Sequence, residues 1–381
     1  MLEDGSTRLQ KYDCIIVGAG AIGLSIAYEL SRHQMRICVL DQAEPGKQTS
    51  WAAGGILPPA DQRQAHDSIG RLRGLSHRLY PEWASDLRRE TGIDVEYRVC
   101  GGLYLSRGAG ETASLIAAVK QWRSDGINVE EVDSSDLGRL EPVLGDLAES
   151  ASVRRAYWLA DEAQVRSPRL TKALIIACRA RGVEVLGDRR VVAFQRQDGE
   201  AVAVTTSQES LQAERFCVTA GAWTRQLMLP VNLSLELYPW RGQMALLSGE
   251  PGLLKCVVNE GPNYLVPRLD GRILAGSTVE EVGFDCTTTE EAIAELGRFV
   301  AELAPRLAEL PVEATWAGLR PSTGDGLPFI GKVPGLRNVY LAAGHFRSGV
   351  HLAPGTAVIV SQMMRGEPCT VDPTEFRLER E

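Results

Sequence analysis

The sequence predicts an α/β fold in which a Rossmann-like unit near the N-terminal end is followed by a separate β-rich region. Three observations support this prediction. Residues 12–42 alternate strand, glycine turn, helix and strand, which is the pattern of a βαβ unit. Residues 230–285 have mainly strand signals, and amphipathic helices lie between the two regions. A chain of 381 residues, 44% of them hydrophobic, is large enough to form two or three such cores.

The turn of the first unit carries a glycine pattern. Gly18, Gly20 and Gly23 match G-x-G-x-x-G. The first allows the tight turn, the second lets a pyrophosphate approach the backbone, and the third allows close packing of the helix, whose N-terminus faces the phosphates. Asp41 ends the second strand, where a carboxylate accepts hydrogen bonds from a ribose hydroxyl. We therefore expect a dinucleotide here, although Asp41 alone is equally consistent with a solvated strand end.

The choice between NAD and FAD depends on the next segment, because both share this glycine pattern. Residues 46–59, "GKQTSWAAGGILPP", are small where an ordinary Rossmann fold begins another helix. Small side chains let the backbone lie against a flat ring system. No second G-x-G-x-x-G follows a strand, so no separate nicotinamide domain is indicated. The pattern favours FAD, with a plain surface loop and a NAD-dependent dehydrogenase as the alternatives.

Further helices and strands are predicted along the rest of the chain. A run of threonines before Glu290 and Glu291 predicts the N-cap of a late helix. Helices are predicted within 60–90, 111–126, 167–182 and 288–304, and strands within 95–106, 183–187, 189–197, 201–207, 215–223, 242–248, 263–269, 272–278 and 339–344.

Composition narrows the classes of partner. A net charge of -8 does not suit a protein that neutralises phosphates, so we expect no nucleic-acid partner. The eight cysteines are scattered without a C-x-x-C pair, so we expect no metal site and no disulfide framework. Residues 1–11 lack the features of a signal peptide, and no run approaches the ~20 apolar residues that cross a bilayer. We expect a cytoplasmic protein without stable membrane insertion.

Five further segments complete a pattern that covers nearly the whole chain. They are "TSWAAGGIL" at 49–57, "VTAGAW" at 218–223, "NYLVPR" at 263–268, "WAGLRPSTGDGLPFIG" at 316–331 and "AAGHFRSGV" at 342–350. With the glycine pattern they resemble the D-amino-acid oxidase family of flavoenzymes, and the glycine oxidases of the thiamine pathway are the members most similar. The resemblance implies a discontinuous FAD-binding domain and a substrate domain with a large mixed β-sheet. The implied ranges are 11–85, 146–225 and 312–370 for the first domain, 86–145 and 226–311 for the second, and 1–10 and 371–381 for tails.

The resemblance also implies noncovalent FAD contacts at matching positions. Beside the three glycines these are Ala21, Ile22, Asp41, Gln42, Thr49, Ser50, Gly54, Gly55, Ile56, Val191, His345, Phe346, Arg347, Ser348, Gly349, Val350 and His351. The C-terminal glycine segment would then return to the N-terminal site and close it near the polar edge of the flavin.

Three residues match the family's substrate-binding and catalytic positions. Arg320 would pair with the substrate carboxylate, because a guanidinium offers two parallel hydrogen bonds in a planar fork. Tyr264 would lie over the substrate, and Arg347 would lie where flavin and substrate meet. The plainer alternatives are a solvated strand end for Arg320, a half-buried sheet tyrosine for Tyr264 and a surface position for Arg347.

The activity that the resemblance implies is FAD-dependent oxidative deamination of glycine, sarcosine or small D-amino acids. Hydride would pass to flavin N5, and O2 would be reduced to H2O2. A homo-oligomer and a thiazole-pathway enzyme as partner are also implied. A D-amino-acid dehydrogenase, another amine oxidase of the family and a non-catalytic FAD-binding protein remain alternatives.

Overall fold

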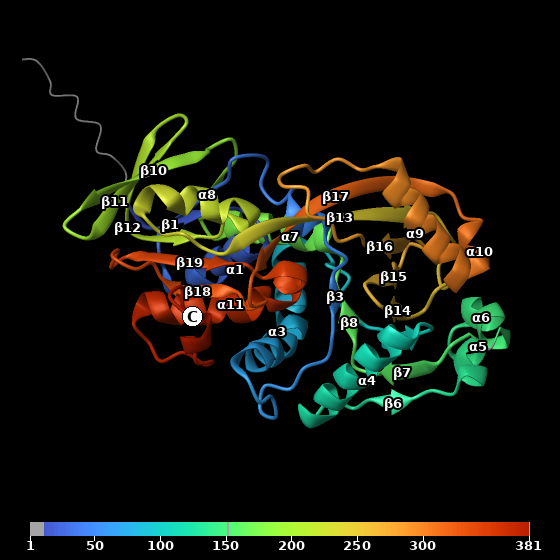
Figure 1. Ribbon diagram of the computed structural model, residues 1–381. Coiled ribbons are helices and arrows are strands. Elements are labelled where there is room, and N and C mark those ends of the chain that lie inside the picture. Colours follow the sequence, from blue (N-terminus) through green and yellow to red (C-terminus); the bar gives the residue numbers. More distant parts are fainter. Residues whose placement is uncertain (1–10, 151, 381) are drawn as a thin grey trace, which may run out of the picture.

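The computed structural model describes residues 11–150 and 152–380, and two large sheets organise them (Figure 1). The first sheet has the order β10-β11-β12-β1-β2-β9, and β19 joins it by pairing with both β12 and β18. β1 is parallel to β2 and to β12, as a βαβ unit requires. Its strands are β1 (Tyr12–Val17), β2 (Ile37–Leu40), β9 (Glu184–Leu186), β10 (Val191–Gln197), β11 (Glu200–Thr206), β12 (Ser210–Val218), β18 (Phe329–Lys332) and β19 (Val339–Ala343).

Both faces of the first sheet are buried. Cys14 and Ile16 of β1 enter a core with helices α1, α3, α7 and α11, whereas Ile15 and Val17 enter the core on the opposite face. This alternation follows from the two-residue period of a strand. The helices of the chain are α1 (Ala21–Leu30), α2 (Thr49–Ala52), α3 (Ser68–Thr91), α4 (Ala109–Ser124), α5 (Leu137–Leu140), α6 (Gly145–Glu149), α7 (Ser167–Ala180), α8 (Thr224–Met228), α9 (Glu290–Leu303), α10 (Pro305–Ala308) and α11 (Gly349–Arg365).

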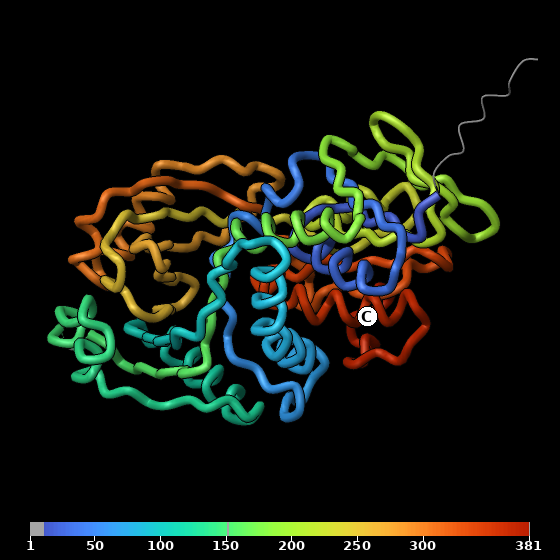
Figure 2. The backbone as a smooth tube through the Cα atoms, turned by 180° about the vertical axis from the view of Figure 1, so that it is seen from behind, coloured from blue at the N-terminus to red at the C-terminus, as the bar shows by residue number. Residues whose placement is uncertain are grey.

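The second sheet lies beside the first part of the molecule, as the view from behind also shows (Figure 2). Its order is β17-β13-β16-β15-β14-β5-β7-β6. Leu265 packs outward in a core with Phe299 and Leu303 of α9, while Tyr264 belongs to the cluster on the inner face. Its strands are β5 (Gly102–Ser106), β6 (Glu130–Glu131), β7 (Arg155–Leu159), β13 (Leu237–Leu247), β14 (Val257–Glu260), β15 (Asn263–Pro267), β16 (Ile273–Gly276) and β17 (Val312–Thr323).

Pairing corrects two details of the sequence prediction. β7 and β17 lie within the ranges 146–225 and 312–370, which were assigned to the FAD-binding domain, yet both pair in the second sheet. Ladder hydrogen bonds between distant segments decide this, and periodicity does not reveal them. The remaining domain boundaries stay a prediction.

A small third sheet links the two parts and changes another expectation. Its order is β3-β8-β4, with β3 (Ile56–Leu57), β8 (Ala163–Gln164) and β4 (Arg98–Val99). The predicted strand–turn–strand within 95–106 therefore sends its two strands to different sheets. The small-residue segment 46–59 contains the one-turn α2 as well as β3, and the Thr49 hydroxyl donates to the carbonyl of Leu319 on β17 at 2.6 Å.

The C-terminal residues pack against the body of the protein. Val371, Phe376 and Leu378, in the range expected to be a tail, are buried. The other expected tail, 1–10, and residue 381 lie outside the described residues. The predicted threonine cap is confirmed, because the Thr289 side chain accepts a hydrogen bond from the Ala292 N–H. Over the described ranges, no helix combines the length and apolar character needed to cross a membrane.

Replacing Gly23 by alanine should destabilise the protein, because a β-carbon there would lie 1.9 Å from the carbonyl oxygen of Gly18. We expect a loss of about 1–3 kcal/mol in the free energy of unfolding, measured by urea denaturation. Gly297 of α9 is the matched control, since a β-carbon there meets open space and should stabilise the helix by ~0.5–1 kcal/mol. Equal stabilities of the two variants would contradict the packing role of Gly23.

Candidate active site

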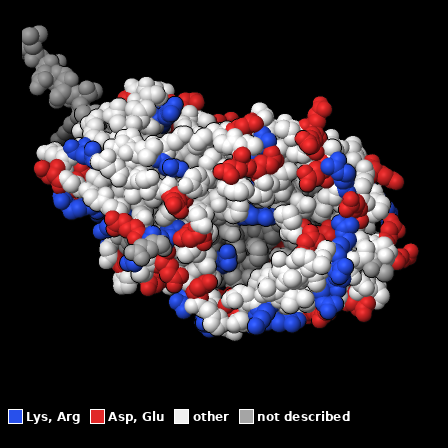
Figure 3. Space-filling model, in the orientation of Figure 1, with Lys and Arg blue, Asp and Glu red and all other residues white. Residues whose placement is uncertain are grey.

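A cavity of about 480 Å³ extends from the glycine turn after β1 to the inner face of the second sheet. The surface is hollowed between the two parts of the molecule (Figure 3). Gly23 packs behind the glycine turn, and the other predicted site residues line the cavity, although what each binds stays a prediction. These lining residues are Gly18, Gly20, Ala21, Ile22, Asp41, Gln42, Thr49, Ser50, Gly54, Gly55, Ile56, Val191, Tyr264, Arg320, His345, Phe346, Arg347, Ser348, Gly349, Val350 and His351.

Close contacts and hydrogen bonds hold the glycine turn in place. Gly18 has φ +114°, and a β-carbon there would lie 2.3 Å from the carbonyl oxygen of Thr219. The Asp41 carboxylate accepts hydrogen bonds from the backbone N–H groups of Ala19 at 2.7 Å and Ala43 at 3.0 Å. Burial raises the pKa of Asp41, and these hydrogen bonds oppose that rise. The turn therefore places a half-buried acid and the N-terminus of α1 at one end of the cavity.

The small-residue segment 46–59 packs closely between the two large sheets. Gly55 has φ +74°, and a β-carbon there would lie 2.0 Å from the carbonyl oxygen of Val165. The buried Arg268 guanidinium donates to the carbonyl of Gly54 at 2.7 Å and to Gln164 Oε1 at 2.9 Å. Burial lowers the pKa of Arg268 to about 10, so it stays charged at neutral pH. Its charge-assisted hydrogen bonds hold the segment in the cavity wall.

One row of residues across the second sheet forms the floor of the substrate end. Met244 pairs in register with Gly276, Gly276 with Tyr264, Tyr264 with Asn259, and Asn259 with Tyr104. Directly paired residues share a face of the sheet, so this row faces the cavity. A β-carbon on Gly276 would lie 2.6 Å from Met244 Sδ, and the Tyr264 hydroxyl contacts that sulfur at 3.5 Å.

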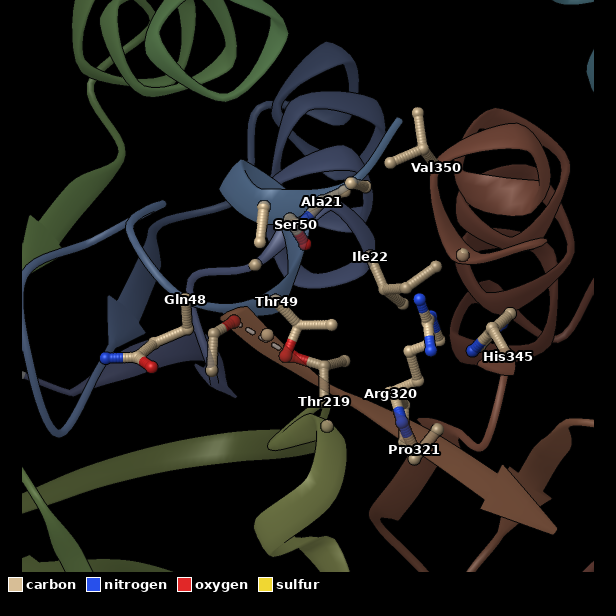
Figure 4. A pocket seen from close by; sticks show the side chains of 18 of the residues that line it. Ala21, Ile22, Gln48, Thr49, Ser50, Thr219, Arg320, Pro321, His345 and Val350 are labelled. Atoms are coloured by element: carbon tan, nitrogen blue, oxygen red, sulfur yellow. Dashed lines mark hydrogen bonds between the residues drawn. The ribbon is translucent and has the colours of Figure 1, made fainter. Parts of the chain in front are cut away.

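Arg320 extends from β17 over the adjacent strand. A β-carbon on Gly242 of β13 would lie 1.9 Å from Arg320 Nη2, so only glycine leaves room for the guanidinium. Its nitrogens donate to Ser277 Oγ at 2.7 Å and to the Thr278 carbonyl at 2.9 Å. Figure 4 shows the side chain among residues of the N-terminal turn and the C-terminal segment.

No carboxylate pairs with Arg320 among the residues that the structure describes. The neighbouring acid, Glu280, is bound instead by Arg241, whose Nε donates to it at 3.0 Å. Burial lowers the pKa of Arg320, and the nearby charge of Arg347 lowers it further. A half-buried guanidinium whose hydrogen bonds go to neutral oxygens is suited to bind a carboxylate ligand.

Arg347 and Arg320 converge on the same cavity, but their settings differ. Arg347 is exposed, and its Nη2 donates to the carbonyl of Pro262 at 2.8 Å. Helix α11 begins two residues later, so its N-terminus also faces the cavity. Burial lowers the pKa of His345 and of His351 to about 3, which keeps both imidazoles neutral. Nε2 of His351 is buried without a partner within the described residues.

Sequence reasoning missed several lining residues, among them Thr219, Asn259 and Tyr104. Thr219 follows β12, which is parallel to β1, and the rule that ligands lie at the carboxyl ends of parallel strands offered a signal for it. Asn259 and Tyr104 carried no comparable signal, because the pairing of β5 with β14 places them beside Tyr264.

These features fit FAD. The cavity joins a glycine turn and a half-buried acid at one end to neutral histidines, a second helix N-terminus and an unpaired buried nitrogen further along. Arg320, half-buried and without a carboxylate partner among the described residues, lies at the far end. The fold and the site define the class of dinucleotide-binding flavoproteins.

Comparison of this chain with known proteins identifies its family. The sequence profile of the FAD dependent oxidoreductases, the DAO family, matches residues 13–363, so the chain belongs to this family and FAD is its cofactor. The glycine oxidase of Pseudomonas aeruginosa is 35% identical over 363 residues, which are 95% of this chain and 97% of that protein. The crystal structure of glycine oxidase from Geobacillus kaustophilus matches with a TM-score of 0.91 at 29% identity, covering 97% of this chain and 99% of that one. The bifunctional protein ThiO/ThiG of Trichormus variabilis is 32% identical over 92% of this chain and 52% of its own length.

Replacing Gly242 by alanine should displace the Arg320 guanidinium and weaken carboxylate binding. We expect the Kd of acetate for the FAD-loaded enzyme to rise about tenfold or more, because a charge-assisted hydrogen bond contributes ~1.5–3 kcal/mol. Titration calorimetry measures this, and retained flavin absorbance shows that the dinucleotide end is intact. The Gly297→Ala variant should bind acetate as the parent does, and an unchanged Kd in Gly242→Ala would contradict the steric role of this glycine.

Proposed function

We propose that this protein oxidises the amine of glycine and of small relatives such as sarcosine and small D-amino acids. The products are an imino acid and, with O2 as electron acceptor, H2O2. The observation that carries the proposal is Arg320, a half-buried guanidinium in the FAD cavity without a carboxylate partner among the described residues. The names of the relatives, glycine oxidases, support the same substrate class.

Arg320 and Tyr264 orient the substrate. The guanidinium binds the carboxylate through two hydrogen bonds, and the Tyr264 ring limits the space beside it. FAD, when bound, accepts the hydride from the α-carbon. Loss of a hydride from carbon and a proton from nitrogen forms the C=N bond, and two electrons and two protons convert O2 to H2O2. The protein contributes mainly orientation and exclusion of water.

The charges in the cavity favour the reactive form of the amine. An amine loses its α-hydride readily only when it is uncharged, and two guanidinium groups, Arg320 and Arg347, line the cavity. Like charges disfavour protonation, so they lower the pKa of a bound ammonium group. The neutral imidazoles of His345 and His351 add no charge.

The likeness to ThiO/ThiG supports a place beside a thiazole-forming enzyme, which would consume the imino acid. The eight cysteines are free thiols, which supports the expected reducing compartment, the cytoplasm. Self-association into a homo-oligomer rests on the family resemblance and stays a prediction.

Anaerobic mixing tests the reaction directly. Glycine and sarcosine should bleach the flavin absorbance, a carboxylate-free amine should not, and air should restore the colour with formation of H2O2. Reoxidation by a quinone but not by O2 would indicate a dehydrogenase. Flavin that no amine reduces would contradict the proposed reaction and favour a non-catalytic FAD protein.

Replacing Arg320 by alanine should lower kcat/KM for glycine about 100-fold, chiefly through KM, because two charge-assisted hydrogen bonds are lost. Flavin content should not change. The exposed Arg139 is the matched control, and Arg139→Ala should leave both quantities unaltered. An unchanged KM in the Arg320 variant would refute the carboxylate role.

A further inference from the structure

Behind the cavity wall, at the β14–β5 side of the second sheet, lies a buried acid that the proposed reaction does not use. Glu162 is 0% exposed. The Tyr104 hydroxyl donates to its Oε2 at 2.5 Å, and the Asn259 amide donates to its Oε1 at 3.2 Å. Tyr104 and Asn259 both line the cavity, whereas Glu162 lies behind them. The acid is therefore connected to the cavity through two polar side chains.

The chain is built to accommodate this carboxylate. A β-carbon on Gly102 would lie 2.4 Å from Glu162 Cδ, so glycine is required on β5 beneath it. The backbone N–H groups of Cys100 and Gly101 donate to the carbonyl of Glu162 at 3.0 Å each. Trp122 of α4 packs edge-on against the Tyr104 ring at 4.9 Å between centroids. These contacts hold both the acid and Tyr104 in place.

The hydrogen bonds determine what this end presents to a ligand. Because Tyr104 and Asn259 use donors toward Glu162, each keeps an acceptor for the cavity, the Tyr104 oxygen and Asn259 Oδ1. No hydrogen bond within the described residues uses Asn259 Oδ1. These two acceptor oxygens belong to side chains that are hydrogen-bonded to the Glu162 carboxylate. They therefore favour a ligand nitrogen that donates hydrogen bonds and carries positive charge.

The register of the sheet separates this end from Arg320. The guanidinium is bonded to Ser277 and Thr278, which follow β16, and Asn259 and Tyr104 lie two and three strands away in the order β16-β15-β14-β5. Strands are spaced about 4.8 Å apart, so the separation is about 10–14 Å between backbones. Tyr264, between them, directs its hydroxyl to Met244 on the Arg320 side. A ligand reaching both ends has several carbons between its carboxylate and its nitrogen.

We propose that Glu162, acting through Tyr104 and Asn259, makes this end of the cavity a subsite for the ammonium or other donor nitrogen of a substrate side chain. Glu162 is a positioning residue, and Tyr104 and Asn259 contact the ligand. This inference rests on the proposed function, because it adds a class of substrate, the amino acid with an amine-bearing side chain, to the same site.

Matched pairs of ligands without an α-amine test the subsite by binding alone. The pairs are 4-aminobutanoate with pentanoate and 5-aminopentanoate with hexanoate, in which a methyl group replaces the ammonium group. Calorimetry with the FAD-loaded enzyme should show that at least one amino compound binds about tenfold more tightly than its alkyl partner. Equal Kd values within both pairs would overturn the proposal, whatever any variant does.

Variants test whether Glu162 causes the tighter binding of the amino compounds. Glu162→Gln should abolish it, and Tyr104→Phe should reduce it. Glu141 is the matched control, a carboxylate that is also 0% exposed and accepts backbone hydrogen bonds of Lys255 and Cys256 outside the cavity. Glu141→Gln should retain the preference. A preference that persists in both Glu162→Gln and Tyr104→Phe would overturn the proposal.

The preference should increase with pH. Burial raises the pKa of Glu162 to about 7, so its negative charge appears as the pH rises through that value. Burial raises the pKa values of the neighbouring titratable groups Tyr104, Cys100 and Cys256, which stay neutral, and the nearby charge of Arg347 opposes that rise at Tyr104. The ratio of the two Kd values should grow from about pH 6 to about pH 8, while the ligand's own amine remains protonated. A ratio that falls over this range would contradict the role of the carboxylate.

The two proposals fail separately. If glycine does not reduce the flavin but the amino carboxylates keep their preference, the reaction is wrong and the subsite stands. If glycine reduces the flavin and no ligand pair differs, the reaction stands and the subsite is overturned.

Discussion

The end of the cavity at the second sheet depends on one half-buried cation, the Arg320 guanidinium. Removing a guanidinium from water is unfavourable unless hydrogen bonds replace its hydration. Here the replacements are the Ser277 hydroxyl and the Thr278 carbonyl, and Gly242 leaves the space that the guanidinium occupies. Glu280, the neighbouring acid, is bound by Arg241. Arg320 therefore keeps its charge without a carboxylate partner among the described residues.

A carboxylate is accommodated in the same way at the other end of the row of paired residues that crosses the second sheet. Glu162 lies over Gly102 much as Arg320 lies over Gly242, and in both cases a glycine on a neighbouring strand makes room for the charged group. Between them, the in-register residues Tyr264 and Asn259 set the spacing. Sheet register thus controls the electrostatic profile of the cavity, because a shift by one residue would turn the whole row to the other face.

Local patterns predicted the βαβ unit and its glycine turn. Gly23 packs on the carbonyl of Gly18, and Asp41 accepts hydrogen bonds from Ala19 and Ala43, so these contacts lie within one short stretch of sequence, whereas the close contact of Gly18 with Thr219 depends on the pairing of β1 with β12. The arrangement of the second sheet was harder to predict from the sequence. β5 and β14 are separated by about 150 residues yet lie parallel, and β7 and β17 join a sheet other than the one expected. The family resemblance supplied Arg320 and Tyr264, but Glu162 belongs to none of its motifs.

The sequence by itself determined the βαβ unit, the glycine turn and the class of cofactor, because these depend on local backbone geometry and on residues adjacent in the chain. Only the tertiary structure decided that Arg320 remains without a carboxylate partner among the described residues and that Tyr104, Asn259 and Glu162 form a polar end to the cavity. The physical reason is that hydrogen bonds between strands bring distant residues together, and burial then determines which of their charges stay unpaired.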